Sequence, residues 1–292
     1  MATLDISIAI CTINPNTCLR LLCSLMDFKK EGDQIIVFVD GETYMEKVGN
    51  DFTVFCRENQ IELLINKDNR GLSYCRNVAM KEAQHRYLIF FDDDTILIND
   101  TLCSFREQFQ KGKTMGGARL ALPETYKKKT RFLSKGYSYL FAVHHQEEKI
   151  WGACFGFDVQ IAREYDLFFN QNLGRKGRGL QSGDDTLFVK EYLEKDDNAF
   201  FVQTPVLHKF DPNRLKIKYI VRRVFWQGRS EIRRYNFKAG WKKERSRSAT
   251  NENLIQIVMT IFLRVVFLVG CLWEKISSVL IEDDIEREEG GY

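Results

Sequence analysis

Residues 87–94 read Tyr-Leu-Ile-Phe-Phe-Asp-Asp-Asp, an apolar run that ends abruptly in three acids. The run 87–91 predicts a buried strand because it is short, apolar and rich in aromatic and branched side chains. Three neighbouring carboxylates repel one another unless a cation lies among them. Side chains alternate along a strand, so Asp92 and Asp94 share one side and can converge on a hard cation such as Mg²⁺ or Mn²⁺. A solvated acidic turn that caps the next helix is the alternative.

Similar β-rich runs precede this stretch and alternate with helical patterns. Strands are predicted at residues 6–11, 35–39 and 61–65, in addition to 87–91. Short connections between strands and helices are typical of a mostly parallel, Rossmann-like central sheet with helices on both faces. Ligands of such α/β sheets bind at the carboxyl ends of the strands. The polar residues that follow the strands are therefore the first candidates for a site.

Three helices are predicted from the periodicity of apolar residues. One follows the turn at residues 14–16, one is capped by Ser73 and continues to about residue 84, and one covers 186–193. Residues 123–150 are polar and aromatic, which indicates a long functional loop or small helices. The buried face of the first helix is expected to carry Leu19, Leu22, Cys23 and Met26.

Composition indicates a folded protein with unevenly distributed charge. The chain has 292 residues, 44% of them hydrophobic, and a net charge of +3. These values exclude disorder and predict one large domain or one domain with an appendage. Residues 209–248 hold 14 Lys or Arg and three acids, whereas residues 282–289 hold six acids and one Arg. The start of the chain does not resemble a secretory signal, and eight cysteines without metal-site spacing are expected to be reduced, as in a cytosolic protein.

Several familiar catalytic motifs are excluded. Glu107 stands where a P-loop ending in Gly112-Lys113-Thr114 would need glycine. No Gly-x-Gly-x-x-Gly follows the first predicted strand, so a dinucleotide site has no support. Gly-x-Ser-x-Gly and His-Glu-x-x-His are also missing from the sequence, which excludes the usual serine hydrolase and zinc peptidase motifs.

Short motifs before the triple Asp occur in a characteristic order. Asn69-Arg70-Gly71 is followed by Arg76-Asn77, by an Ala-containing helical stretch and then by the acids. This order resembles the Asn-x-Gly, Ala-Arg-Asn and Asp-x-Asp elements of the family 2 glycosyltransferases of the GT-A fold. Thr12 with Asn14-Pro15, and Asp40 after the second strand, are similar to the start of that family's domain.

The resemblance continues downstream and covers residues 5–230. Gly152-Ala153-Cys154-Phe155 resembles the family's acceptor-side segment, and Gly183-Asp184-Asp185-Thr186-Leu187 stands where the family has Gly-Glu-Asp-x-x-Leu. His208 lies where a late His often occurs. Asp40 is followed by Gly-Glu rather than Gly-Ser, which puts the uridine contacts in doubt. Residues 222–227 are only loosely similar to the Gln-x-x-Arg-Trp signature of processive polymerases, so transfer of a single sugar is favoured.

The resemblance implies an inverting, metal-assisted hexosyl-type transferase that uses a nucleotide-diphosphate sugar, with UDP-sugar favoured. Asp94, Asp92 and His208 would bind Mg²⁺ or Mn²⁺. Asp185 would be the general base that deprotonates the acceptor hydroxyl, with Asp184 its equal for that role. Trp151 and Gly152 would lie on the acceptor side. The nucleotide-sugar would contact Thr12, Asp40, Asn69, Gly71, Arg76, Asp92 and Asp93.

Structural roles compete with these assignments. Asp185 could cap the helix that is predicted from residue 186. His208 could be a structural histidine, Arg76 an ordinary surface residue of its helix, and Trp151 a core residue.

The C-terminal region is predicted to be a helical extension. The expected division is a transferase domain at 1–210, a basic helical segment at 211–250, an amphipathic helix at 251–281 and an acidic tail at 282–292. No run of 18 uncharged apolar residues exists, and the central Arg264 argues against a span exposed to lipid. A narrow polar stripe runs along the helix, formed by Asn253, Gln256, Thr260, Arg264, Cys271 and Glu274.

This helix leaves two interpretations open. It could be an in-plane membrane anchor assisted by the basic segment, or a helix packed on the core or on a second subunit in a homodimer. The first places the enzyme in the cytoplasm, peripheral at the inner face of the cell membrane, beside lipid-linked saccharide acceptors of polysaccharide or glycoconjugate biosynthesis. Two other functions compete: a sugar-nucleotide-forming nucleotidyltransferase, and a non-catalytic basic protein that binds nucleic acid or anionic membrane. Nucleic acid is not favoured, because the basic segment shows no recognisable RNA-binding pattern.

Overall fold

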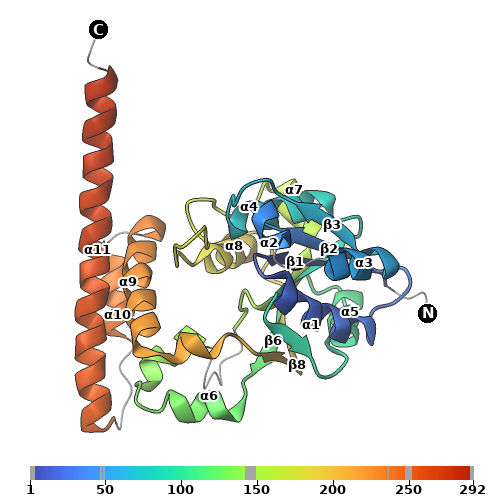
Figure 1. The fold of residues 1–292 in the computed structure, drawn as a ribbon, viewed down its shortest axis with the longest axis horizontal. Helices are drawn as coiled ribbons and strands as arrows, with labels where there is room; N and C mark the ends of the chain where they lie inside the picture. Colours follow the sequence, from blue (N-terminus) through green and yellow to red (C-terminus); the bar gives the residue numbers. More distant parts are fainter. Residues whose placement is uncertain are drawn as a thin grey trace. The chain divides into compact units, whose positions relative to one another are not determined.

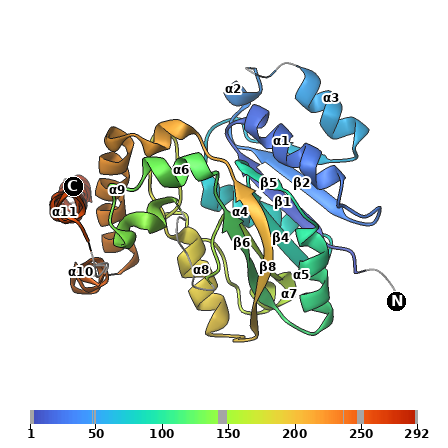
Figure 2. The ribbon, with the colours of Figure 1, turned by 90° about the horizontal axis from the view of Figure 1, so that it is seen from below.

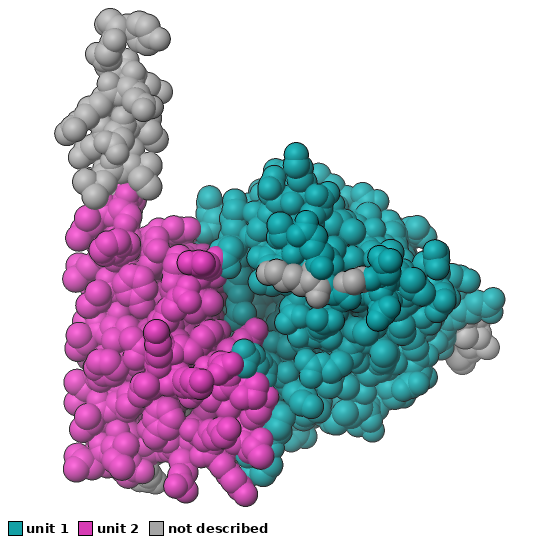
Figure 3. Space-filling model, viewed as in Figure 1, with its two compact units in different colours: residues 1–124, 145–177, 184–211 teal, residues 125–144, 178–183, 212–292 magenta. Residues whose placement is uncertain are grey.

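The computed structural model divides into two units, coloured in Figure 3. The structure describes residues 4–46, 48, 50–141, 149–235, 237–246 and 252–289. Unit 1 comprises residues 1–124, 145–177 and 184–211. Unit 2 comprises residues 125–144, 178–183 and 212–292. Residues 247–250 of the basic segment and 290–292 of the acidic tail lie outside the described residues.

Unit 1 is built on an eight-stranded sheet, seen from below in Figure 2. The four strands predicted from the sequence are confirmed, with ends shifted by about one residue. The strands are β1 (Ser7–Thr12), β2 (Gln34–Val39), β3 (Glu62–Ile65), β4 (Tyr87–Asp92), β5 (Thr95–Leu97), β6 (Met115–Ala121), β7 (Cys154–Asp158) and β8 (Ala199–His208).

The order of the strands is β3-β2-β1-β4-β7-β6-β8-β5. β1, β2, β3 and β4 pair in parallel, as do β6 and β8. The pairs β4–β7, β6–β7 and β5–β8 are antiparallel. Because β7 runs against β4, the residues that precede β7 lie beside the carboxyl end of β4. The antiparallel β5–β8 pair likewise brings His208 opposite Thr95, next to the triple Asp.

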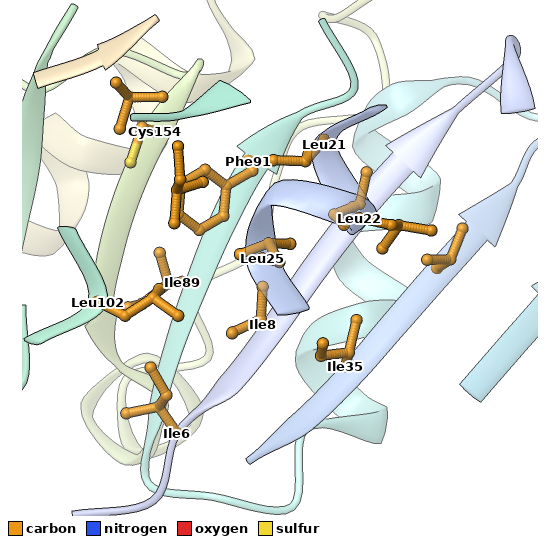
Figure 4. Packing of buried hydrophobic residues seen from close by; sticks show 14 of the residues in the cluster. Ile6, Ile8, Leu21, Leu22, Leu25, Ile35, Ile89, Phe91, Leu102 and Cys154 are labelled. Atoms are coloured by element: carbon orange, nitrogen blue, oxygen red, sulfur yellow. The ribbon is translucent and has the colours of Figure 1, made fainter. Parts of the chain in front are cut away.

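Alternation along the strands divides the apolar side chains between the two faces of the sheet. Ile8 and Ile89 lie in one buried cluster, whereas Ala9 and Phe90 lie in the other. Figure 4 shows the first cluster, in which side chains of α1 pack on β1, β2 and β4. The helices of that cluster are α1 (Pro15–Met26), α3 (Asn50–Glu58) and α5 (Thr101–Gln110). The opposite cluster contains residues of α4 (Leu72–Glu82), α7 (Val159–Glu164) and α8 (Asp184–Leu193).

Two details of the predicted helices are wrong. Of the predicted buried face of α1, Leu22 is buried and Leu19 and Met26 pack partly buried against the core, but Cys23 is exposed. The fully buried side chains are Cys18, Leu21, Leu22 and Leu25, so the face is centred toward the residues one position earlier. The N-cap of helix α4 is Gly71, not Ser73. Ser73 is the second residue of the helix, and its hydroxyl donates a hydrogen bond to the Leu173 carbonyl (2.8 Å).

Unit 2 is helical. Figure 1 shows its long helices side by side, with α9 and α10 packed along α11. A short α2 (Glu42–Met45) belongs to unit 1, and α6 (Glu124–Lys129) begins at the boundary between the units. The other elements of unit 2 are η1 (Lys135–Phe141), η2 (Pro212–Leu215), α9 (Ile217–Arg234), α10 (Phe237–Arg245) and α11 (Leu254–Glu289).

Helices α9 and α11 approach each other at two glycines. A Cβ at Gly228 would overlap the Phe267 carbonyl, and a Cβ at Gly270 would overlap the Phe225 carbonyl. Glycine is therefore required for the two backbones to come this close. In the described part of the chain, Leu254–Ser278 of α11 is the one segment long and apolar enough to cross a membrane, judged by length and composition.

Candidate active site

The carboxyl ends of β1, β2 and β4 lie next to one another because these strands are parallel neighbours. They carry Thr12, Asp40 and Asp92, three of the predicted site residues. The Thr12 hydroxyl donates a hydrogen bond to Asp93, so the first strand and the triple Asp are joined directly. The predicted cluster of polar residues at this edge of the sheet is therefore present.

Asp40 is buried and organises the loop that follows β3. Its carboxylate accepts hydrogen bonds from the Arg70 and Gly71 N–H groups and from the Asn66 side chain, each at 2.8 Å. Asn69 donates to the Asp40 carbonyl (3.1 Å). These bonds hold the Asn69-Arg70-Gly71 motif at the edge of the sheet. The sequence did not reveal that the carboxylate of Asp40 binds backbone, nor that Asn66 takes part.

Asp92, Asp94 and His208 form the group of described residues that could hold a metal ion. One ligand atom from each lies within 4.8 Å of the others. His208 Nε2 is 3.1 Å from Asp94 Oδ1, and the Lys209 N–H donates to the Asp94 carbonyl (2.8 Å). Two carboxylates and one imidazole are ligands that suit Mn²⁺, and carboxylates suit Mg²⁺. The donor set therefore fits a divalent cation.

The pKa of Asp92 supports the same conclusion. Burial raises the pKa of this carboxyl, Arg76 opposes the rise, and the neighbouring Asp94 adds to it. The metal-free cluster therefore disfavours the charged form of Asp92. A bound cation would remove that penalty, because an opposite charge close by favours the carboxylate.

Arg76 lies at the centre of the site. It is 3% exposed, so the surface interpretation of this residue is wrong. Its guanidinium binds Asp184 (2.8 Å), Asp92 (3.3 Å) and the Gly152 carbonyl (3.1 Å). Burial alone would lower the pKa of Arg76, but the carboxylates of Asp184 and Asp92 outweigh it and raise the pKa. Arg76 thus orients the two acidic groups toward each other.

Asp184 and Asp185 occupy the first turn of α8 and differ in environment. Asp184 is 4% exposed, and burial raises its pKa against the opposing effect of Arg76. Asp185 is half-buried; its carboxylate accepts hydrogen bonds from the Gly152 N–H (2.9 Å) and the Thr186 N–H (2.7 Å). Asp184 is committed to Arg76, whereas Asp185 is held by backbone donors and is the more accessible of the two.

Gly152 links these groups from the loop before β7. Its N–H binds Asp185 and its carbonyl accepts from Arg76. A Cβ at this position would lie 2.5 Å from Asp185 Oδ2, so the close approach requires glycine. Trp151 is half-buried, and its ring lies 4.2 Å from the Lys149 ammonium. Both predicted acceptor-side residues therefore lie on the loop that contacts Asp185.

The sequence gives no indication of how the residues before Asp184 are held within unit 2. The Ser182 N–H donates to the Ser230 hydroxyl of α9 (3.1 Å), and Arg223 donates to the Leu180 carbonyl (3.2 Å). Gly183 has φ +95°, and a Cβ there would overlap the Arg234 guanidinium. Gly183 belongs to the motif of residues 183–187, but nothing in the sequence indicates its partners in α9.

Comparison with known proteins gives a family and a fold. The family model "Glycosyl transferase family 2" matches residues 7–166, which is more than half of the chain. A glucosyl-dolichyl phosphate glucuronosyltransferase of Haloferax volcanii is 25% identical over 214 residues, covering 68% of this chain and 66% of its own. The chain therefore spans slightly less than two thirds of the length of that relative.

Two solved structures are similar in fold. TarS of S. aureus in complex with UDP has a TM-score of 0.52 at 15% identity, covering 76% of this chain and 65% of that one. The mannosyltransferase PcManGT from Pyrobaculum calidifontis, in complex with GDP-Man and Mn²⁺, has a TM-score of 0.55 at 9% identity, covering 98% of this chain and 87% of that one. At these identities the likeness shows the fold alone.

Proposed function

The chain belongs to glycosyl transferase family 2 and has the GT-A fold, and we propose that it transfers a single sugar from a nucleotide-diphosphate sugar to an acceptor hydroxyl with inversion. The observation that carries the proposal is the network in which Arg76 joins Asp92 of the acidic cluster to Asp184 of α8. It links the proposed cation-binding cluster to the first turn of α8, which also carries Asp185, the candidate base. Family membership favours a transferase over a nucleotidyltransferase or a non-catalytic basic protein.

The donor would bind at the carboxyl ends of β1, β2 and β4. In this proposal Asp94, Asp92 and His208 hold Mn²⁺ or Mg²⁺, which would neutralise charge that develops on the leaving diphosphate. Asp40 keeps the loop of residues 69–71 in place for the nucleotide. Donation from Thr12 fixes the orientation of Asp93. UDP is the favoured nucleotide on the resemblance, and the TarS structure contains UDP.

Asp185 is the proposed general base. Its carboxylate would accept the proton of the acceptor hydroxyl as that oxygen attacks the anomeric carbon from the face opposite the diphosphate. The Gly152 and Thr186 N–H groups hold the carboxylate in position before the acceptor arrives. Asp184, paired with Arg76, would set the position of the first turn of α8. Attack from the opposite face inverts the anomeric configuration.

The acceptor is proposed to be a saccharide, lipid-linked in the favoured case, in glycoconjugate or polysaccharide assembly. The name of the Haloferax volcanii relative contains a dolichyl phosphate, which supports a lipid-linked acceptor. The enzyme would then be cytoplasmic and peripheral at the inner face of the membrane. Residues 1–210 are proposed as the transferase domain, 211–250 and 251–281 as its helical extension, and 282–292 as an acidic tail.

A transfer assay tests the proposal. The full chain is incubated with Mn²⁺, a membrane lipid extract and one radiolabelled donor at a time: UDP-glucose, UDP-glucuronate, UDP-N-acetylglucosamine or GDP-mannose. We expect label in the lipid or saccharide fraction with one donor, and its loss in Asp185→Asn. Equal labelling by wild type and Asp185→Asn would overturn the assignment of the base, and no labelling with any donor would count against this donor and acceptor class.

A further inference from the structure

Helix α11 has two opposite faces of different chemistry. The polar stripe predicted from the sequence faces the rest of unit 2. Gln256 donates to the Arg131 carbonyl (3.1 Å) and Arg264 to the Arg245 carbonyl (3.1 Å). Glu274 pairs with Arg229 and Arg233 of α9. Thr260 and Cys271 are buried on the same side. The polar stripe therefore lies on the packed side of the helix, together with the buried Leu263 and Phe267.

The other face of α11 is apolar and exposed. The side chains on it are between 43% and 76% exposed. At 3.6 residues per turn they span an arc of about 160° along the helix. They are Leu254, Ile255, Ile257, Val258, Ile261, Phe262, Val265, Val269, Leu272, Trp273 and Ile276.

We propose that this apolar face docks on an anionic lipid bilayer, with α11 lying in the plane of the membrane rather than crossing it. One edge of the face carries Trp273, a side chain that favours the boundary between lipid and water. A helix with one broad apolar face and a polar opposite face is typical of an interfacial helix. The proposal assigns a defined surface to the peripheral membrane location that was proposed for the enzyme. It does not depend on the transfer chemistry.

Packing on α9 argues against a transmembrane orientation. Helices α9 and α10 together hold ten Lys or Arg and two acids. Helix α11 packs closely on α9, at Gly228 of α9 and at Gly270 and Glu274 of α11. A spanning α11 would therefore draw the charges of α9 and α10 into hydrocarbon. In the interfacial plane, the same charges remain in the headgroup region and water.

The exposed charges also favour an anionic surface. The two acids of α9 and α10 are buried: Glu231 pairs with Arg234 and Lys243, and Glu244 accepts from the Tyr137 hydroxyl. Every exposed charged residue of the two helices is basic, as is Lys275 on α11. The exposed basic residues of α9 and α10 are Lys218, Arg222, Arg233, Lys238, Lys242 and Arg245. Lys or Arg near anionic headgroups strengthens membrane binding.

A second copy of the chain fits this face less well. A two-helix seam covers only the narrow a and d positions of each helix, and charged residues usually flank it. The exposed arc of α11 is broader, and the apolar side chains of Met259 and Val266 lie just beyond one margin of it. A bilayer covers the whole arc, whereas a paired helix would leave much of it in water.

Vesicle binding by the full chain, without any sugar donor, tests the proposal. We expect binding to vesicles of phosphatidylcholine with 30% phosphatidylglycerol, weaker binding to phosphatidylcholine alone, and weakening at 0.5 M NaCl. Ile261→Glu, near the centre of the arc, should lower the partition coefficient at least tenfold. The matched control is Ile98→Glu, the same change at an isoleucine of unit 1 that is 48% exposed, and it should bind as wild type does. Circular dichroism checks that both variants are folded.

Three results would overturn the proposal. One is equal vesicle binding by Ile261→Glu and wild type. Another is retention of the expressed protein in cell membranes after a carbonate wash at pH 11, which would show a spanning helix; release into the wash is expected. The third is a wild-type dimer that binds no vesicles and that Ile261→Glu converts to a monomer, which would identify a second copy as the occupant. None of these readouts uses transfer activity, so failure here leaves the proposed reaction untouched.

Discussion

The sheet of unit 1 and helix α11 of unit 2 distribute polarity in opposite ways. Unit 1 buries apolar side chains on both faces of its sheet and carries the carboxylates of its site, Asp40 and Asp92, at the ends of β2 and β4. Helix α11 turns its polar stripe inward and leaves its apolar face exposed. The first arrangement is that of a protein that water surrounds, and the second matches a surface that meets lipid. Helix periodicity therefore shows which residues share a face but not which face packs inside.

The largest expected effect is on the chemistry of unit 1. Asp185→Asn removes the proposed base but keeps a side chain that can accept from the Gly152 N–H. We expect kcat to fall by about 10²–10⁴-fold, the usual contribution of a general base, with unchanged affinity for the nucleotide. Steady-state kinetics and nucleotide titration measure the two quantities. A fall in nucleotide affinity alone would show that Asp185 belongs to the donor site instead.

Replacing Arg76, whose guanidinium lies at the centre of the site in unit 1, should have the largest effect on the free energy of unfolding. Arg76→Met leaves Asp184 and Asp92 without their shared partner, and breaking a buried pair in this way costs about 3–5 kcal/mol. Urea unfolding measures the loss. Arg70→Met is the matched control because that side chain is exposed and lies over the Tyr74 ring. A similar loss in both variants would contradict the central position of Arg76.

The attachment of α11 can be broken at one glycine. Ala is the better helix former, so propensity alone predicts that Gly270→Ala gains about 0.5–1 kcal/mol. The close approach of the Phe225 carbonyl predicts the opposite, a loss of about 1–3 kcal/mol. Val269→Ala, on the exposed face, should change stability far less. Thermal unfolding of both variants separates the two expectations, and a stabilised Gly270→Ala would show that α11 is not held as described.

The smallest expected effect is a pH dependence of stability in unit 1. The pKa of Asp92 in the folded chain lies above its ordinary value of 3.8. The stability that this shift contributes is therefore present below pH 3.8 and is lost as pH rises through the folded pKa. In EDTA, wild type should lose more stability than Asp92→Asn as the pH rises from 4 toward 7. Parallel melting curves for the two proteins across this range would contradict the prediction.

Much of unit 1 was predictable from the sequence because its signals are local. The run before Asp92 marks a strand, and the order of the motifs identifies the fold. The surroundings of Arg76 were not predictable, because they depend on β7 running against β4 and on α8 starting beside it. Both are contacts between segments about 75 to 110 residues apart in the chain.

The polar stripe of α11 shows a different limit. Its spacing was visible in the sequence, and so was the charge of the segment before it. What the stripe contacts depends on Gly228 and Gly270, whose role appears only when α9 and α11 are placed together. Helix periodicity carries no information about that partner.

The most direct test of the central claim is thermal stability with UDP, GDP, CDP and dTDP, each with and without Mn²⁺, in wild type and Asp94→Asn. A ligand at about 100 times its Kd stabilises the folded state by about 2.7 kcal/mol, which is a measurable shift in Tm. We expect a shift with one nucleotide that requires Mn²⁺ and disappears in Asp94→Asn. A shift that persists without metal, or in the variant, would contradict a cation-assisted donor site on Asp92, Asp94 and His208.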